Sequence, residues 1–169
     1  MDGMNARLFA LLRSVFFSAI FVSIWTWFLP RGFARGPLEP RWSVAAVALM
    51  VLGGAIMLRC VWDFGWNGEG TPMPLDPPRR FVVRALYRYV RNPMYIGMGV
   101  FLIGEALLLP AITRAMLGML AVLIVTVHAF VLLHEEPALR ARFGGDYLDY
   151  CRNVRRWLPR LKPFGQGRV

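Results

Sequence analysis

An arginine, a tyrosine and two glycines stand in one short run whose residue types could bind an anionic ligand. Residues 91–99 read Arg-Asn-Pro-Met-Tyr-Ile-Gly-Met-Gly, at the start of an apolar stretch. Proline presets the first turn of a helix, the free N–H groups of that turn favour an anion, and glycine lets a ligand approach the backbone. Arg91 with Gly97 and Gly99 therefore predicts a seat for a carboxylate. Alternatively, Arg91 anchors the helix at a membrane surface and the glycines pack against another helix.

Two adjacent carboxylates, Glu135 and Glu136, follow the last long apolar stretch. Like charges beside a hydrocarbon boundary repel each other and lose solvation, so a cation is expected near them. That cation belongs either to a ligand or to one of the arginines of the chain.

Glu105 and His128 are ionisable residues within apolar stretches. Glu105 lies about two helical turns beyond Gly97 on the same stripe, and His128 lies about two turns before Glu135. Both stripes are expected to line one cavity, in which these residues would orient an acceptor or move its proton. The alternative is a hydrogen bond that only fixes helix packing.

The composition indicates that membrane helices position these residues. The chain has 169 residues, of which 57% are hydrophobic and 18% are charged, and its mean hydropathy is +0.47. Soluble domains are roughly 45–50% apolar and about 25% charged, so a water-soluble basic protein and a disordered chain are excluded. Cys60 and Cys151 are too few for a disulfide framework or a metal-ligand cluster, and we expect no metal.

Four apolar segments are long enough to cross a bilayer, which takes about 20 helical residues. They are residues 8–29, 42–62, 95–112 and 115–133. The first is too long for a removable signal peptide, and the short linker Thr113-Arg114 makes the last two a tight antiparallel hairpin. The prediction is an all-α membrane protein with about four transmembrane helices in one domain, residues 1–169. Residues 1–62 hold two N-terminal spans, and residues 63–169 hold the functional core.

The basic residues predict the orientation. The chain has 20 Lys and Arg against 10 Asp and Glu, a net charge of +10. Four spans place the N-terminus, residues 63–93 and the tail after His134 on one side, which carries most of the arginines. The other side carries only Arg31, Arg35, Arg41 and Arg114. The positive-inside rule then puts both termini in the cytoplasm, at a bacterial inner membrane. Because the arginines follow this topology, we expect membrane lipids as partners and no nucleic acid.

The cytoplasmic segments carry their own structure signals. Residues 65–91 begin with glycines and prolines that forbid a regular helix and predict an extended, proline-rich lid. Residues 81–89 predict a short interfacial helix, and residues 135–150 predict a C-terminal amphipathic helix. The pair Gly144-Gly145 is expected to kink that helix.

Three runs of the sequence together resemble a known superfamily. They are GTPMPLDPPRR, YRYVRNPMYIGMG and EEPALRARFGGDYLDYCRNVRRWLPR, in this order over residues 68–160. The combination is similar to the integral-membrane methyltransferases, which include isoprenylcysteine carboxyl methyltransferases and phospholipid N-methyltransferases. The first two spans match only in hydrophobic character.

The resemblance implies that S-adenosylmethionine binds near the cytoplasmic face. The residues expected to bind it are Arg91, Asn92, Tyr95, Gly97, Gly99, Glu135 and Glu136. Arginine suits the carboxylate of the cofactor and glutamate suits its ammonium. A leucine at Gly97 or Gly99 is expected to block the cofactor while the protein stays folded. Many relatives carry histidine where this chain has Asn92, so an acid or base role is not expected there.

The same resemblance implies methyl transfer to a lipophilic acceptor, as in isoprenylcysteine carboxyl methyltransferases. A phospholipid or a small-molecule nitrogen or sulfur acceptor is the alternative. The candidate catalytic residues are Glu105, His128 and Tyr95. A protonated amine acceptor would need one of them as a base, whereas a carboxylate or thiolate acceptor would not. A non-enzymatic membrane module that binds anionic lipid is the rival from another class. No feature of the sequence indicates the oligomeric state.

Overall fold

The computed structural model describes residues 3–63 and 83–165, and the regular structure of these stretches is helical, with no strand. The predicted all-α class is therefore confirmed. The first stretch contains α1 (Gly3–Ser23), the π-helical turn η1 (Ile24–Phe28), α2 (Leu29–Phe33) and α3 (Val44–Trp62). The second contains the 3-10 turn η3 (Ala85–Arg88), α4 (Pro93–Leu108), the 3-10 turn η4 (Pro110–Ile112), α5 (Thr113–Phe130), the π-helical turn η5 (Val131–Glu135) and α6 (Glu136–Asn153).

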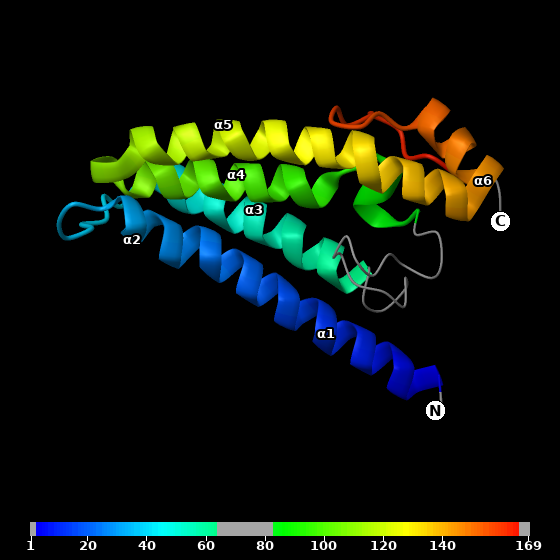
Figure 1. Cartoon of the computed structure of the whole chain (residues 1–169), viewed down its shortest axis with the longest axis horizontal. Helices are drawn as coiled ribbons and strands as arrows, with labels where there is room; N and C mark the ends of the chain where they lie inside the picture. The colour runs from blue at the N-terminus through cyan, green and yellow to red at the C-terminus, as the bar shows by residue number, and fades with distance from the viewer. Residues whose placement is uncertain (1–2, 64–82, 166–169) are drawn as a thin grey trace.

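Three long helices lie side by side, with α4 between α3 and α5 (Figure 1). Helix α1 approaches them at the end that holds α2 and diverges toward the other end (Figure 1). The core between the helices is built mainly from large apolar side chains of α4 and α5. Its fully or nearly buried members are Met57, Met98, Leu102, Ala106, Ile112, Met116, Leu120 and Leu123.

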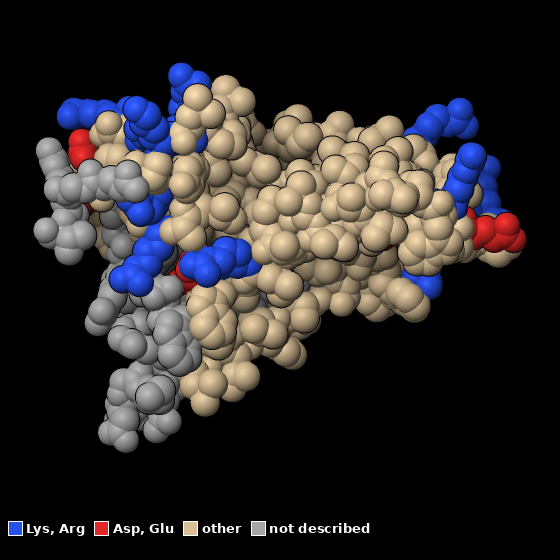
Figure 2. Space-filling model, turned by 180° about the vertical axis from the view of Figure 1, so that it is seen from behind, with Lys and Arg blue, Asp and Glu red and all other residues tan. Residues whose placement is uncertain are grey.

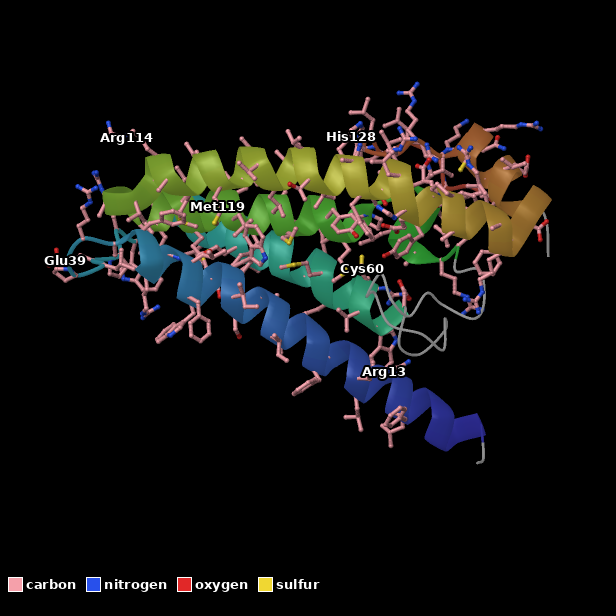
Figure 3. The ribbon with its side chains drawn as sticks, in the orientation of Figure 1. Arg13, Glu39, Cys60, Arg114, Met119 and His128 are labelled. Atoms are coloured by element: carbon pink, nitrogen blue, oxygen red, sulfur yellow. The ribbon has the colours of Figure 1, made fainter. Side chains whose placement is uncertain are left out.

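Charged side chains gather toward the two ends of the molecule and leave an uncharged surface between them (Figure 2). One end holds Glu39 and Arg114, whereas Arg13 and His128 lie toward the end that holds α6 (Figure 3). An uncharged belt between two charged ends is the distribution that a membrane-spanning protein requires.

In the part of the chain that the structure describes, two helices are long and apolar enough to cross a bilayer. They are α3 and the continuous helix Pro110–Asn153, whose apolar part comprises α5 and the residues up to Leu133. Helix α4 is apolar but has 16 residues, about 24 Å at 1.5 Å per residue. It ends at Leu108 because Leu109 leaves helical geometry (φ −114°, ψ 75°) before Pro110. The count of four spans stays a prediction.

The segments beside the long helices differ in part from their predictions. Residues 64–82, which hold most of the predicted proline-rich lid, lie outside the described residues. The helix predicted over residues 81–89 is a single 3-10 turn within the described residues 83–89, because Arg84 is extended and Ala85 has a φ of 42°. The kink predicted in the C-terminal helix is present, since Gly144 has a φ of 54° and a ψ of −125°.

Glycines bring α3 and α4 into direct backbone contact. A Cβ on Gly53 would lie 2.5 Å from both the carbonyl oxygen of Gly97 and the backbone nitrogen of Phe101. A Cβ on Gly104 would lie 2.8 Å from the carbonyl oxygen of Ala46. Small residues at such a crossing let two backbones approach closely, which is how membrane helices gain packing energy. This contact fixes the position of α4, and α4 carries the candidate site.

We predict that Gly53→Ala destabilises the protein, because backbone atoms of α4 cannot move aside for the added methyl group. Overpacking of this kind costs about 1–3 kcal/mol. Gly54→Ala is the matched control, since its Cβ would meet only the Phe101 ring, at 3.9 Å. Thermal unfolding in detergent measures both variants, and equal midpoints would contradict the proposed helix contact.

Candidate functional site

Three segments that are distant in the sequence meet at the end of the molecule that holds α6. They are residues 87–95, residues 131–140 and the segment after α6, residues 154–164, which we call the C-terminal strap. The strap returns along the first segment through backbone hydrogen bonds. These run from Arg91 N to Arg155 O (3.0 Å), Arg160 N to Tyr89 O (2.9 Å) and Phe164 N to Arg88 O (2.9 Å). The strap therefore fixes the entry to α4.

A buried carboxylate, that of Glu136, joins all three segments. Its Oε1 accepts hydrogen bonds from Arg91 Nη1 (2.9 Å) and Arg156 Nε (2.7 Å), and its Oε2 accepts one from Arg156 Nη2 (2.9 Å). Arg140 adds a longer ion pair at 3.7 Å. Glu136 is 3% exposed, so these cations provide the stabilisation that a buried charge requires.

The electrostatic balance at Glu136 favours its charged form. Glu136 lies beyond the apolar stretch that ends at Leu133. Burial raises the pKa of Glu136, but the hydrogen bond from Arg156 and the charges of the surrounding guanidinium groups outweigh it and hold the pKa below its usual range. The same hydrogen bond raises the pKa of Arg156. The carboxylate is therefore already neutralised by the protein itself.

In Arg91, the guanidinium nitrogen Nη1 contacts the protein, whereas Nε has no partner among the described residues. Its Nη1 also contacts Cys151 Sγ at 2.9 Å. Its Nε is buried and has no hydrogen-bond partner among the residues that the structure describes. A buried guanidinium donor without an acceptor is costly, and a ligand oxygen would satisfy it.

Glu135, next in the chain, lies in different surroundings. Its Oε2 accepts a hydrogen bond from Tyr95 Oη at 3.2 Å. The Trp157 ring of the strap lies against both Tyr95 and His128, with centroid distances of 6.4 Å and 5.9 Å. Trp157 Nε1 also donates to His128 Nδ1 at 3.0 Å. One cluster thus contains Tyr95, Glu135 and His128, and the indole ring of Trp157 in the strap connects its members.

Two predicted cofactor-binding residues have structural contacts. Asn92 Nδ2 donates to the carbonyl oxygen of Arg156 at 3.2 Å, so this amide holds the strap. A Cβ on Gly97 would lie 2.7 Å from Ile56 Cγ2 and 3.0 Å from the carbonyl oxygen of Gly53. The expectation that Gly97→Leu leaves the protein folded is therefore wrong, because a leucine there would push α3 and α4 apart.

Gly99 and Glu105 complete the set of predicted residues. A Cβ on Gly99 would meet no atom within 4 Å among the described residues, so a side chain there is tolerated by the fold. Glu105 is 4% exposed, and its Oε2 has no hydrogen-bond partner in the described part of the chain. No hydrogen bond of the described residues joins buried Glu105 to exposed His128, and their common cavity stays a prediction.

Sequence reasoning missed Arg156 and Trp157. Arg156 was counted only among the arginines that follow the membrane topology, and Trp157 entered only as part of the third run that carries the family resemblance. One signal could have found them: Pro159 forbids helix continuation, so the chain must turn after α6, back toward the acidic pair at its start.

Comparison with known proteins identifies one family. Residues 42–146 match the family model described as phospholipid methyltransferase. The match covers α3, α4, α5 and the first part of α6. No curated protein and no solved structure matches the chain.

We predict that Glu136→Gln lowers the free energy of unfolding by about 3 kcal/mol, because it leaves buried arginines without their counter-charge. Glu39→Gln is the control, since Glu39 is exposed at the opposite end of the molecule (Figure 3). Thermal or denaturant unfolding measures the difference. A fully stable Glu136→Gln variant would show that the ion pairs do not hold the three segments together.

Proposed function

Since the chain belongs to the phospholipid methyltransferase family, a family of membrane methyltransferases, we propose that it transfers a methyl group from S-adenosylmethionine to a lipophilic acceptor in the membrane. The observation that carries this proposal is a pair of polar groups beside Glu136 whose hydrogen-bonding capacity the described residues do not fill. They are the Nε of Arg91 and the carboxylate of Glu135. They suit the two charged ends of an amino acid.

The residues fit the amino-acid part of the cofactor. S-adenosylmethionine has an α-carboxylate, an α-ammonium and a sulfonium. The buried, unpartnered Nε of Arg91 suits the carboxylate. Glu135 suits the ammonium, because among the described residues its hydrogen bond from Tyr95 occupies a single carboxylate oxygen. Glu136 is already paired with two guanidinium groups, so we assign it to holding Arg91 rather than to the ammonium.

The protein contributes alignment and exclusion of water. When bound, S-adenosylmethionine supplies an activated methyl group for in-line displacement. Such a reaction needs the acceptor held on the axis of the breaking bond. We propose that Tyr95, Glu105 and His128 orient the acceptor or take its proton. We further propose four spans with both termini in the cytoplasm, which places Arg91 and Glu135 where a soluble cofactor can enter.

Two acceptor classes fit the proposal. The first is a carboxylate such as that of isoprenylcysteine, for which the displacement needs no base. The second is the amine of a phospholipid, and the description of the matching family model favours it. An amine must first lose a proton, so only this acceptor requires a base among the three residues.

Methyl transfer by the purified protein tests the function. The protein is incubated with methyl-labelled S-adenosylmethionine and vesicles that contain either phosphatidylethanolamine or a prenylated cysteine. Label in the lipid fraction is the expected result, and the acceptor that takes it defines the class. Absence of label from both lipids and from a total membrane lipid extract would contradict lipid methylation.

We predict that Glu135→Gln weakens binding of S-adenosylhomocysteine about 10- to 100-fold, since a charge-assisted hydrogen bond is worth about 1.5–3 kcal/mol. Its unfolding midpoint should stay close to that of the parent, in contrast to Glu136→Gln. Calorimetric titration measures the affinity. Unchanged affinity would remove Glu135 from the cofactor site.

We also predict that Gly99→Leu prevents cofactor binding without unfolding the protein, because the added side chain occupies space that the fold leaves open at this position. Gly118→Leu is the matched control, as Gly118 is equally open but lies within α5, toward the other end of the molecule. If Gly99→Leu binds S-adenosylhomocysteine like the control, Gly99 does not face the cofactor.

A further inference from the structure

The hydrogen bond between Trp157 and His128 determines how the histidine can act. An indole N–H is a donor only, so the nitrogen that it contacts must offer a lone pair. That nitrogen is His128 Nδ1, 3.0 Å from Trp157 Nε1. A neutral imidazole with an accepting Nδ1 carries its proton on Nε2. His128 therefore presents an N–H donor and has no lone pair left for a base.

The indole cannot easily move away from the histidine, because the residues before it are tied down. The carbonyl oxygen of Arg155 accepts from Arg91 N at 3.0 Å. Arg156 is held twice, through its side chain to Glu136 and through its carbonyl oxygen to Asn92. Tyr95, hydrogen-bonded to Glu135, lies against the indole as well. The network that holds the strap thus also holds the donor to His128.

The position of His128 indicates what its N–H meets. His128 is exposed, on α5, three residues before the helix passes into η5. The side chains one turn before it on the same face of α5 also point away from the core: Ile124 and Val125 are 59% and 69% exposed. An acceptor that arrives through the membrane therefore reaches His128 from the lipid side.

We propose that Trp157 is a positioning residue that keeps His128 as an Nε2–H donor to an anionic oxygen of the membrane-borne acceptor. This oxygen is either a lipid carboxylate or a phosphate ester, which share the chemistry of a charged acceptor. In this role His128 orients the acceptor, and where the acceptor must lose a proton, another residue removes it. The contact between His128 and the acceptor rests on the proposed function.

The hydrogen bond itself is tested by NMR, independently of activity. In protein labelled with 15N at tryptophan and histidine, a scalar coupling should join Trp157 Nε1 to His128 Nδ1 across the N–H···N bond. His134→Gln leaves His128 as the sole histidine, because the chain has two. Trp157→Phe should abolish the coupling, and Trp42→Phe, at an exposed residue before α3, should keep it. A coupling to Nε2, or none, would overturn the assignment.

Turnover then separates a donor from a base. His128→Gln supplies an amide N–H near the place of Nε2–H, so we expect it to retain most of the activity. His128→Leu, which supplies no donor, should raise KM for the acceptor about tenfold, and Trp157→Phe should raise it in the same direction. Equal loss of kcat in the glutamine and leucine variants would show that His128 is a base and overturn the proposal.

The choice of acceptor distinguishes the two sources of the oxygen. The KM effect of His128→Leu is measured with a prenylated cysteine and with phosphatidylethanolamine. An effect on the first assigns a carboxylate, and an effect on the second assigns a phosphate ester. Turnover with either lipid but no effect of His128→Leu on KM would overturn the contact. If neither lipid is methylated, the proposed function fails, whereas the tautomer of His128 is still decided by the NMR coupling.

Discussion

The site depends on one buried ion-pair network, in which the carboxylate of Glu136 lies between the guanidinium groups of Arg91 and Arg156. Each partner comes from a different segment: the entry to α4, the start of α6 and the C-terminal strap. Burying these charges costs solvation, and an isolated pair contributes little to stability. Here three hydrogen bonds of 2.7–2.9 Å satisfy the carboxylate. The network therefore fixes how three distant segments meet.

Because of this network, the neighbouring residues Glu135 and Glu136 have different electrostatic surroundings. Because Glu136 is held by the arginines of the chain, its charge maintains the architecture. Among the described residues, the Glu135 carboxylate accepts a hydrogen bond from the hydroxyl of Tyr95 on one oxygen, and so keeps capacity for a ligand cation. The same network orients Arg91 so that its Nε remains unpartnered in the described residues. The proposed site for an amino-acid zwitterion thus rests on one ion-pair network.

Helical periodicity and apolar length predicted the helices, because these signals are local. The family resemblance assigned Arg91, Tyr95, Glu135 and Glu136 to one site, and hydrogen bonds join Arg91 to Glu136 and Tyr95 to Glu135. Long-range packing was not predictable in this way. The contact of Gly97 with Gly53 depends on which face of α4 meets α3. The contact of Trp157 with His128 depends on how the strap folds back after α6.

Hydrogen exchange of the full chain in lipid nanodiscs, with and without S-adenosylhomocysteine, tests the central claim most directly, because it locates the ligand without any substitution. The account predicts slower amide exchange in three separate segments upon binding: residues 87–95, residues 131–140 and the C-terminal strap, residues 154–164. These are the segments that the Glu136 network joins. Protection confined to α1 and α3, or no protection at a saturating ligand concentration, would contradict a cofactor site built on this network.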